Sequence, residues 1–143
     1  MAVRKTGMDL SDREQVTLGL ISDTHGTLAC DLLPLLAECD VIVHAGDLLD
    51  PGELRQLTPR SGHVVVVLGN NDTPAQWPGG FDALLDSLPE QAEIALPGGL
   101  LVVEHGHRVN PARTRHQRLR HRHPEARAIV YGHTHRRVID TDE

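Results

Sequence analysis

The stretch VIVHAGDLLD, residues 41–50, joins a short aliphatic run to the pair Gly46 and Asp47. The run has the length and the branched side chains of a buried parallel β-strand, and Asp47 follows at the point where such a strand would end. Four other aliphatic runs also end on side chains that can bind a metal ion. These are LGLIS before Asp23 and His25, VVVVLG before Asn70, LVVE before His105, and AIVYG before His133 and His135. The chain therefore predicts one metal site assembled from five strand ends.

Helical stretches separate most of these strands, which indicates an α/β fold. We expect strands near residues 16–22, 41–45, 64–68, 91–96, 99–105 and 128–131, and helices near 29–38, 52–58, 81–87 and 111–122. Pro97, Gly98 and Gly99 indicate a hairpin between two of the strands. The alternation of strand and helix alone predicts a mostly parallel sheet that is covered by helices on both faces. In such sheets ligands gather at the carboxyl ends of the strands, which is where all the candidate ligands fall.

The chain has the size and the composition of one domain. Its 143 residues, 39% of them hydrophobic, can form a single core. Residues 1–15 are polar and without a sustained period, so we expect a flexible leader or the approach to a first strand, followed by one domain over residues 16–143. No apolar stretch approaches the roughly 20 residues that span a bilayer. The N-terminus also lacks the apolar centre of a signal peptide, so we expect a soluble cytoplasmic protein.

The candidate ligands are oxygen and imidazole donors without a thiolate, which suits Mn²⁺, Fe, Mg²⁺, Co²⁺ or Zn²⁺ better than soft ions. The seven candidates are too many for one tetrahedral ion, and they fit two ions that share a carboxylate. Asp47 can bind one ion with each oxygen and hold the pair about 3.5–4 Å apart, so we expect it to be the bridge. Asp23 and His25 would point to the same side of an extended segment. His133 and His135 repeat this spacing, although a turn could split them between the ions.

The same blocks, in the same order, resemble the signature of the calcineurin-like metallophosphoesterase superfamily. That signature reads D-x-H, G-D-x-x-D, G-N-x-D/E, H and G-H-x-H, and it is matched here by Asp23 to His25, Gly46 to Asp50, Gly69 to Asp72, His105, and Gly132 to His135. The resemblance is greatest to the small single-domain bacterial and archaeal phosphodiesterase branch. It implies a layered α/β/β/α sandwich of mostly parallel and mixed sheets, but the chain stops before the usual C-terminal strands. Either those strands are absent, which would leave an exposed sheet edge that favours a homo-oligomer, or the sequence is shortened.

The resemblance also implies a ligand set and a reaction. One ion would lie on Asp23, His25, Asp47 and His135, and the second on Asp47, Asn70, His105 and His133. We expect two divalent ions, Mn²⁺ before Fe, Ni, Co, Zn or Mg. A hydroxide that bridges the ions would attack a small phosphodiester or nucleotide. Catalytic roles would fall to Asp47, Asn70, Asp72 and His107. Asp72 would orient a ligand or the neighbouring loop, and His107 would touch the phosphate or the leaving group.

Asn71 stands where relatives specialised for phosphomonoesters have a histidine, and an amide cannot act as a general acid. This difference favours phosphodiesters over phosphomonoesters. Two alternatives remain open. One is a phosphomonoesterase or dinucleoside polyphosphate hydrolase that uses the same ions. The other is a non-catalytic scaffold or binding protein on the same fold, as in the retromer subunit that keeps this architecture and also lacks the histidine.

Charge is unevenly distributed along the chain. Residues 1–107 have a net balance of −11 and residues 108–143 one of +5. The basic segment 113–123 has almost no apolar face apart from Leu119, so we interpret it as a solvated surface helix. An anion-attracting rim for a small phosphorylated substrate is the next interpretation. Nucleic-acid binding ranks lower because no aromatic platform accompanies the basic residues.

Three further polar residues have simpler interpretations. We expect His44 to be a packed, hydrogen-bonded histidine inside its strand and His63 to lie on the surface. Asp50 completes the G-D-x-x-D block, and we expect it to cap a helix or to form an ion pair.

Overall fold

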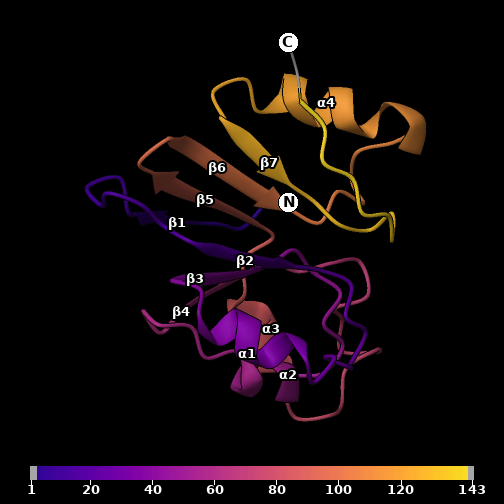
Figure 1. Ribbon diagram of the computed structural model, residues 1–143. Coiled ribbons are helices and arrows are strands. Elements are labelled where there is room, and N and C mark those ends of the chain that lie inside the picture. The colour runs from indigo at the N-terminus through magenta and orange to yellow at the C-terminus, as the bar shows by residue number, and fades with distance from the viewer. Residues whose placement is uncertain (1–2, 142–143) are drawn as a thin grey trace.

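Two β-sheets stack face to face between two layers of helices, as Figure 1 shows for residues 3–141, which are the residues that this computed structural model describes. The first sheet has three parallel strands in the order β2, β3, β4, which are Leu18–Ile21, Val41–His44 and His63–Val66. Three short helices cover its outer face: α1 (Leu32–Ala37), α2 (Gly52–Gln56) and α3 (Asp82–Ser87).

The second sheet has the order β1, β5, β6, β7 and mixes parallel with antiparallel pairs. Its strands are Lys5–Asp9, Gln91–Leu96, Gly99–Glu104 and Ala128–Val130. Strands β5 and β6 form an antiparallel hairpin, whereas β1 pairs in parallel with β5 and β7 pairs in parallel with β6. Helix α4 (Arg115–Arg122), preceded by a 3₁₀ turn at Ala112–Thr114, lies on the outer side of this sheet (Figure 1).

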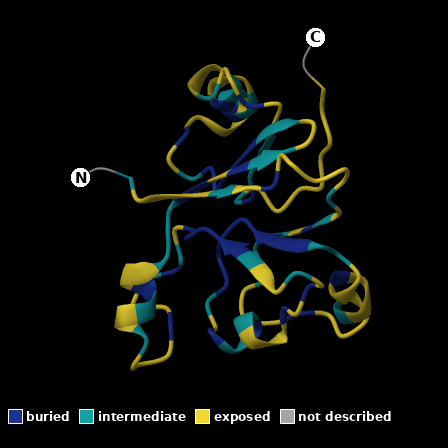
Figure 2. Ribbon diagram, turned by 90° about the vertical axis from the view of Figure 1, so that its left-hand side faces the viewer, coloured by how far each residue is buried: buried dark blue, intermediate teal, exposed yellow. Residues whose placement is uncertain are grey.

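Alternation along the strands decides which side chains form the core. Val43 on β3, Ile94 on β5 and Val103 on β6 are fully buried between the two sheets. The residues that flank Val43, namely Ile42 and His44, are also fully buried but belong to the other face of β3, toward the helices. Figure 2 shows buried residues concentrated along the strands and exposed residues on helices and connecting loops.

The sequence predicted most of these elements correctly. The expected helices and strands from residue 16 onward are all present, with bounds that differ by a few residues, and the hairpin is formed. The α/β/β/α sandwich implied by the resemblance is confirmed. The single sheet covered on both faces, which the alternation alone predicted, is wrong. The strands form two sheets, and the inner face of each is covered by the other sheet instead of by helices.

The N-terminal segment differs from the flexible leader that the sequence predicted for residues 1–15. Lys5–Asp9 form β1, an edge strand. Four of its five residues are exposed, so no apolar period marks it in the sequence. The preceding residue is also fixed, since the backbone N–H of Arg4 donates to Glu90 at 3.0 Å, and Arg108 forms an ion pair with the same carboxylate at 2.8 Å. Residues 1–2 lie outside the described part of the chain.

Helix α4 is less solvated than its basic sequence indicates. Leu119 and Arg115 are 1% and 4% exposed, respectively. The guanidinium Nε of Arg115 donates to the carbonyl of Val109 at 2.8 Å, and Nη2 donates to Asn110 Oδ1 at 3.0 Å. The interpretation of a fully solvated helix is therefore wrong at Arg115, which braces the loop after β6.

The chain beyond β7 forms no further strand within the described residues, which end at 141. Across residues 3–141, none of the helices is both long enough and apolar enough to span a membrane.

Candidate metal centre

The ends of five strands bring the predicted ligands to one edge of the sandwich. Asp23 and His25 follow β2, Asp47 follows β3, Asn70 follows β4, His105 follows β6, and His133 and His135 follow β7. Strands β2, β3 and β4 are parallel to one another, and β6 is parallel to β7, so the carboxyl ends within each group share one edge. The two edges adjoin, because His105 after β6 contacts Asp47 after β3.

The carboxylates of Asp23 and Asp47 form the centre of the cluster. His135 Nε2 is 3.4 Å from Asp23 Oδ1, and His25 Nε2 is 3.5 Å from Asp47 Oδ2. His105 Nε2 lies 3.4 Å from Asp47 Oδ2 and 3.7 Å from Asp23 Oδ1. Two groups of donor atoms each lie within 4.8 Å of one another: Asp23, His25 and His135, and Asp23, Asp47 and His105. This spacing is compatible with donors arranged around a common cation.

Asn70 and His133 join the cluster beside His105. His133 Nδ1 and Asn70 Oδ1 are 3.1 Å apart, and the ring centres of His105 and His133 are 5.1 Å apart. The ring centres of His25 and His135 are also 5.1 Å apart. The turn after β7 therefore separates the two imidazoles of the last block, which is the arrangement that the sequence left open.

His107 is half-buried and borders the same cluster. Its ring centre lies 5.4 Å from that of His105 and 6.3 Å from that of His133. It is thus close enough to the predicted ligands to face a molecule bound there.

Five of the predicted ligands have backbone φ angles in the left-handed region, which L-residues rarely adopt. The angles are 54° at Asp23, 50° at His25, 61° at Asp47, 71° at His133 and 54° at His135. The extended segment expected for Asp23 and His25 is therefore wrong, because both residues have left-handed backbone angles. Such conformations cost about 1–3 kcal/mol each and persist only where the surroundings fix them. Their concentration at the predicted ligands points to a functional site.

Two glycines leave room for the carboxylates. A Cβ added to Gly69 would lie 2.1 Å from Asp47 Oδ1, and one added to Gly132 would lie 2.3 Å from Asp23 Oδ2. Both distances are far shorter than van der Waals contact. The backbone N–H of His133 donates to the same oxygen of Asp23 at 2.9 Å. The G-N and G-H blocks thus need glycine because a carboxylate from another strand packs directly against their backbone.

The carboxylate of Asp72 organises the loops that carry two predicted ligands. It is 5% exposed. Its oxygens accept five N–H groups at 2.7–3.0 Å, from the backbone of Asp47, Leu48, Leu49 and Gly69 and from the indole of Trp77. Because N–H groups of the protein occupy both oxygens, Asp72 positions Asp47 rather than contacting a substrate. The orienting role that the resemblance implied for Asp72 stays a prediction.

Asn71 contacts the carboxylate of Asp47 directly. Its backbone N–H and its side-chain amide donate to the two oxygens of Asp47, each at 2.9 Å. Both hydrogen bonds favour the charged form of the carboxylate. The amide of Asn71 is therefore committed to Asp47, and it has no acidic proton for a leaving group.

The charges of the cluster shift the pKa values of its members. Burial would raise the pKa of Asp47, but the imidazole of His105 and the hydrogen bonds from Asn71 outweigh burial and hold it well below the usual range. Burial would lower the pKa of His105, whereas the carboxylates of Asp47 and Asp23 raise it. Burial is the largest of the causes that lower the pKa of His107 to about 4, so this ring is neutral at pH 7. An ionised Asp47 is the form in which a carboxylate binds a cation.

Two buried atoms of the cluster, Asp23 Oδ1 and His105 Nε2, lack a hydrogen-bond partner. A buried polar atom without a partner is costly, and a carboxylate oxygen especially so. A divalent cation near both atoms would satisfy them with oxygen and imidazole ligands, which is the donor set that such ions accept. The residues present therefore fit a divalent metal. Asp23 belongs to both close groups of donors, whereas the sequence predicted Asp47 as the shared ligand, so the bridging role of Asp47 stays a prediction.

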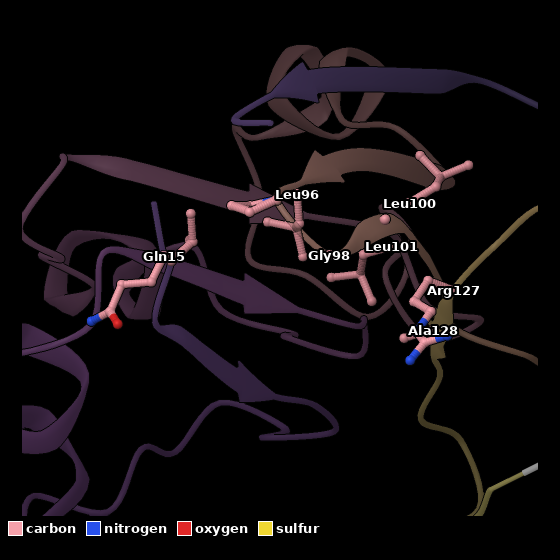
Figure 3. A pocket seen from close by; sticks show the side chains of 10 residues that line it. Gln15, Leu96, Gly98, Leu100, Leu101, Arg127 and Ala128 are labelled. Atoms are coloured by element: carbon pink, nitrogen blue, oxygen red, sulfur yellow. The ribbon is translucent and has the colours of Figure 1, made fainter. Parts of the chain in front are cut away.

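The cavity in Figure 3 is lined by residues other than those of this cluster. It has a volume of about 290 Å³ and is lined by residues before β2, the turn between β5 and β6, and the start of β7. Strands β6 and β7 begin at this cavity and end at the cluster, so the length of the strands separates the two. Its walls are mainly aliphatic, with Leu96 and Leu100 among them, and Arg127 also lines it. None of the predicted ligands lines it. We therefore place the candidate site at the strand ends.

The remaining polar residues behave largely as predicted. His44 is fully buried and hydrogen-bonded, and His63 is exposed. Asp50 Oδ1 accepts the backbone N–H of Gly52, the first residue of α2, at 2.8 Å, although the N-cap of this helix is Pro51. Sequence reasoning missed Ser22, whose hydroxyl donates to Asp23 Oδ2 at 2.5 Å. Its place directly before the first predicted ligand is a signal that could have identified it.

Comparisons with known proteins agree with this architecture. The sequence profile of the calcineurin-like phosphoesterase superfamily domain matches residues 16–143. No curated protein matches the chain. Among solved structures, Vacuolar Protein Sorting 29 from Cryptosporidium parvum is similar with a TM-score of 0.69 and 21% identity, over 90% of this chain and 70% of that one.

Two further solved structures share the fold. A predicted phosphoesterase from Streptococcus pneumoniae is similar with a TM-score of 0.52 and 22% identity, over 86% of this chain and 64% of that one. Wild-type Vps29 from Entamoeba histolytica, solved in complex with zinc, has a TM-score of 0.61 and 21% identity, over 83% of this chain and 64% of that one. Identities this low show the fold alone. The profile match covers most of the chain, and on that ground the chain belongs to the calcineurin-like phosphoesterase superfamily.

Proposed function

We propose that this chain is a metal-dependent phosphodiesterase that hydrolyses a small phosphodiester or a nucleotide. The observation that carries the proposal is the convergence of seven oxygen and nitrogen donors at one edge of the sandwich, with two buried donor atoms left without partners. Membership of a phosphoesterase superfamily supports the same class of reaction.

The proposed ligand sets are those implied by the sequence blocks. Asp23, His25, Asp47 and His135 would hold one ion, and Asp47, Asn70, His105 and His133 the other. Two divalent cations, for which Mn²⁺ is our first choice, would supply Lewis acidity toward a phosphate and would activate water near neutral pH.

Exposure within the cluster gives the substrate a direction of approach. Asp47 and His105 are 1% exposed and form the floor, whereas the side chains of His25 and His135 are 36% and 60% exposed. A phosphate group would therefore reach the centre from the side of the two exposed imidazoles. His107, neutral at pH 7, would offer a hydrogen bond to the phosphate or to the leaving group.

The contacts of Asn71 support the preference for phosphodiesters. A phosphomonoester with a poor leaving group needs a proton donor close to the departing oxygen. The amide at position 71 is bound to Asp47 and cannot donate an acidic proton. Esters with good leaving groups, including activated diesters, depend less on such a donor.

A comparison of two substrates tests this proposal. With Mn²⁺ present, the chain should hydrolyse a bis-aryl phosphate faster than the matching mono-aryl phosphate. Asp47→Asn should abolish turnover, and Asp12→Asn, at an exposed acid outside the ligand blocks, should retain it. Equal or reversed rates would contradict the diester preference and favour the phosphomonoesterase or dinucleoside polyphosphate hydrolase. No turnover with any divalent ion would contradict the enzyme and favour a binding protein on the same fold.

A further inference from the structure

A buried hydrogen-bonded chain lies beneath the metal centre and involves three residues outside the predicted ligand set. The side chain of His44 points to the helix side of its sheet, where it meets Glu53 on α2 and Thr24 on the turn after β2. His44 is 0% exposed and Glu53 is 3% exposed. Neither residue contacts solvent appreciably, so their polar atoms depend on one another.

The hydrogen bonds have one consistent direction. The backbone N–H of Gly46 donates to His44 Nδ1 at 3.1 Å, so the ring proton belongs on Nε2. Nε2 is 2.9 Å from Thr24 Oγ1, which can accept that proton. The hydroxyl of Thr24 in turn donates to Glu53 Oε2. Each donor has an acceptor, and the chain ends on the carboxylate of Glu53.

The hydrogen bonds among Thr24, His44 and Glu53 join the two turns that carry the central carboxylates. Thr24 stands between Asp23 and His25, and the Gly46 N–H that His44 accepts directly precedes Asp47. The backbone of the two turns is also paired, because the N–H of Asp23 donates to the carbonyl of Gly46 at 2.9 Å and that of His25 to the carbonyl of Asp47 at 3.1 Å. The buried side chains therefore add a second connection beneath the first one.

The burial of the Glu53 carboxylate costs free energy that a purely structural position would not require. Its Oε1 is buried without a hydrogen-bond partner. Leu54 on α2 and Leu57 directly after it belong to an aliphatic cluster with Leu36 and Ile42, and an apolar residue at position 53 would avoid the desolvation of a carboxylate. The ligands above it have left-handed backbone angles, which need fixed surroundings to persist. A polar connection with a defined direction provides such surroundings.

We propose that Glu53, Thr24 and His44 are positioning residues that hold Asp23 and His25 against Asp47 and thereby set the affinity for a divalent cation. The inference rests on the proposed function, because it takes Asp23, His25 and Asp47 to be metal ligands. It assigns a role to Glu53, which belongs to none of the ligand blocks.

Paired substitutions at Thr24 test the proposal. Thr24→Val keeps the shape of the side chain and removes the hydroxyl, so it breaks both hydrogen bonds. Thr24→Ser keeps the hydroxyl, and Thr17→Val makes the same change at an exposed threonine before β2. Mn²⁺ affinity is measured by calorimetry on each folded variant, together with chemical unfolding of the metal-free protein.

We expect Thr24→Val to weaken Mn²⁺ binding about 10- to 100-fold, which is typical when a group that orients a metal ligand is removed. Thr24→Ser and Thr17→Val should bind as the unaltered chain does. Thr24→Val protein that is less stable but binds Mn²⁺ with unchanged affinity would overturn the proposal, because that result describes a structural role alone.

Glu53→Gln keeps the inference falsifiable if Thr24→Val does not fold. The glutamine retains an oxygen for Thr24 but replaces a charged acceptor with a neutral one, so the Mn²⁺ affinity of Glu53→Gln should fall below that of the unaltered chain. Unchanged affinity in Glu53→Gln would overturn the proposal in that case. If the unaltered chain binds no divalent ion, the proposed function fails first, and the two failures are thus distinguished.

Discussion

Asp72→Asn should destabilise the metal-free protein strongly, although it changes one oxygen into a nitrogen. Asp72 Oδ1 accepts three N–H groups and Oδ2 accepts two, from the backbone of Asp47 and Gly69. An asparagine would keep its oxygen at the position with three donors, and its NH₂ group would then face the other two. Those two donors would lose their acceptor in a site that is 5% exposed.

The magnitude follows from the two lost contacts. A hydrogen bond to a charged group contributes about 1.5–3 kcal/mol, so the loss of two predicts a fall of about 3–6 kcal/mol in the free energy of unfolding. This is a large part of the roughly 5–15 kcal/mol that stabilises a typical domain. Mn²⁺ affinity should fall as well, because both orphaned donors lie in loops that carry Asp47 and Asn70.

Urea denaturation of the metal-free protein measures this effect, with linear extrapolation to water. Asp12→Asn, at an exposed position, is the matched control and should change the free energy of unfolding by less than about 0.5 kcal/mol. A fall of less than about 1 kcal/mol in Asp72→Asn would refute the reasoning, since a single charge-assisted contact already exceeds that value.

Three further predictions concern the packing around the site, the metal and the pH. Gly69→Ala should weaken Mn²⁺ binding at least tenfold in a calorimetric titration, because the added Cβ would lie 2.1 Å from Asp47 Oδ1. Gly98→Ala is the control and should leave the affinity unchanged, because open space surrounds Gly98. Equal affinities in the two variants would disprove the packing argument. Mn²⁺ at about 100 times its dissociation constant should raise the free energy of unfolding by about 2.7 kcal/mol per site. The melting temperature should rise accordingly and return with a chelator, and an unmoved melting temperature would speak against a metal site. Burial would raise the pKa of Glu90, but hydrogen bonds and nearby guanidinium groups outweigh burial and lower the pKa from 4.5. Glu90→Gln should therefore destabilise the folded protein at pH 7. The difference in unfolding free energy from the unaltered chain should vanish as the pH falls through the lowered pKa, and a difference that persists at low pH would exclude this ion pair as the cause.

Side chains at strand ends could be predicted from the sequence because their placement depends on chain direction alone. Once the aliphatic runs are parallel strands, Asp23, Asp47 and Asn70 must follow their carboxyl ends. His105 and His133 contact this group only because the second sheet faces the first. The alternation of strands and helices did not indicate that arrangement. The family resemblance provided that arrangement.

Other features have no signal in the sequence. The exposed strand β1 lacks an apolar period, so its pairing with β5 could not be predicted. The left-handed angles at Asp23 and His25 accompany hydrogen bonds to Gly46 and Asp47, which are far from them in the sequence, so the local sequence alone did not predict these angles. Glu53 likewise lies in an ordinary short helix, and only its burial against Thr24 gives it a role.

Metal stoichiometry tests the central claim most directly. The chain, produced without a histidine tag and dialysed against Mn²⁺, should retain two ions per molecule by elemental analysis, and Asp47→Asn should lose both. A chain that retains no ion, or an Asp47→Asn variant that keeps two, would contradict a dinuclear centre built on Asp47.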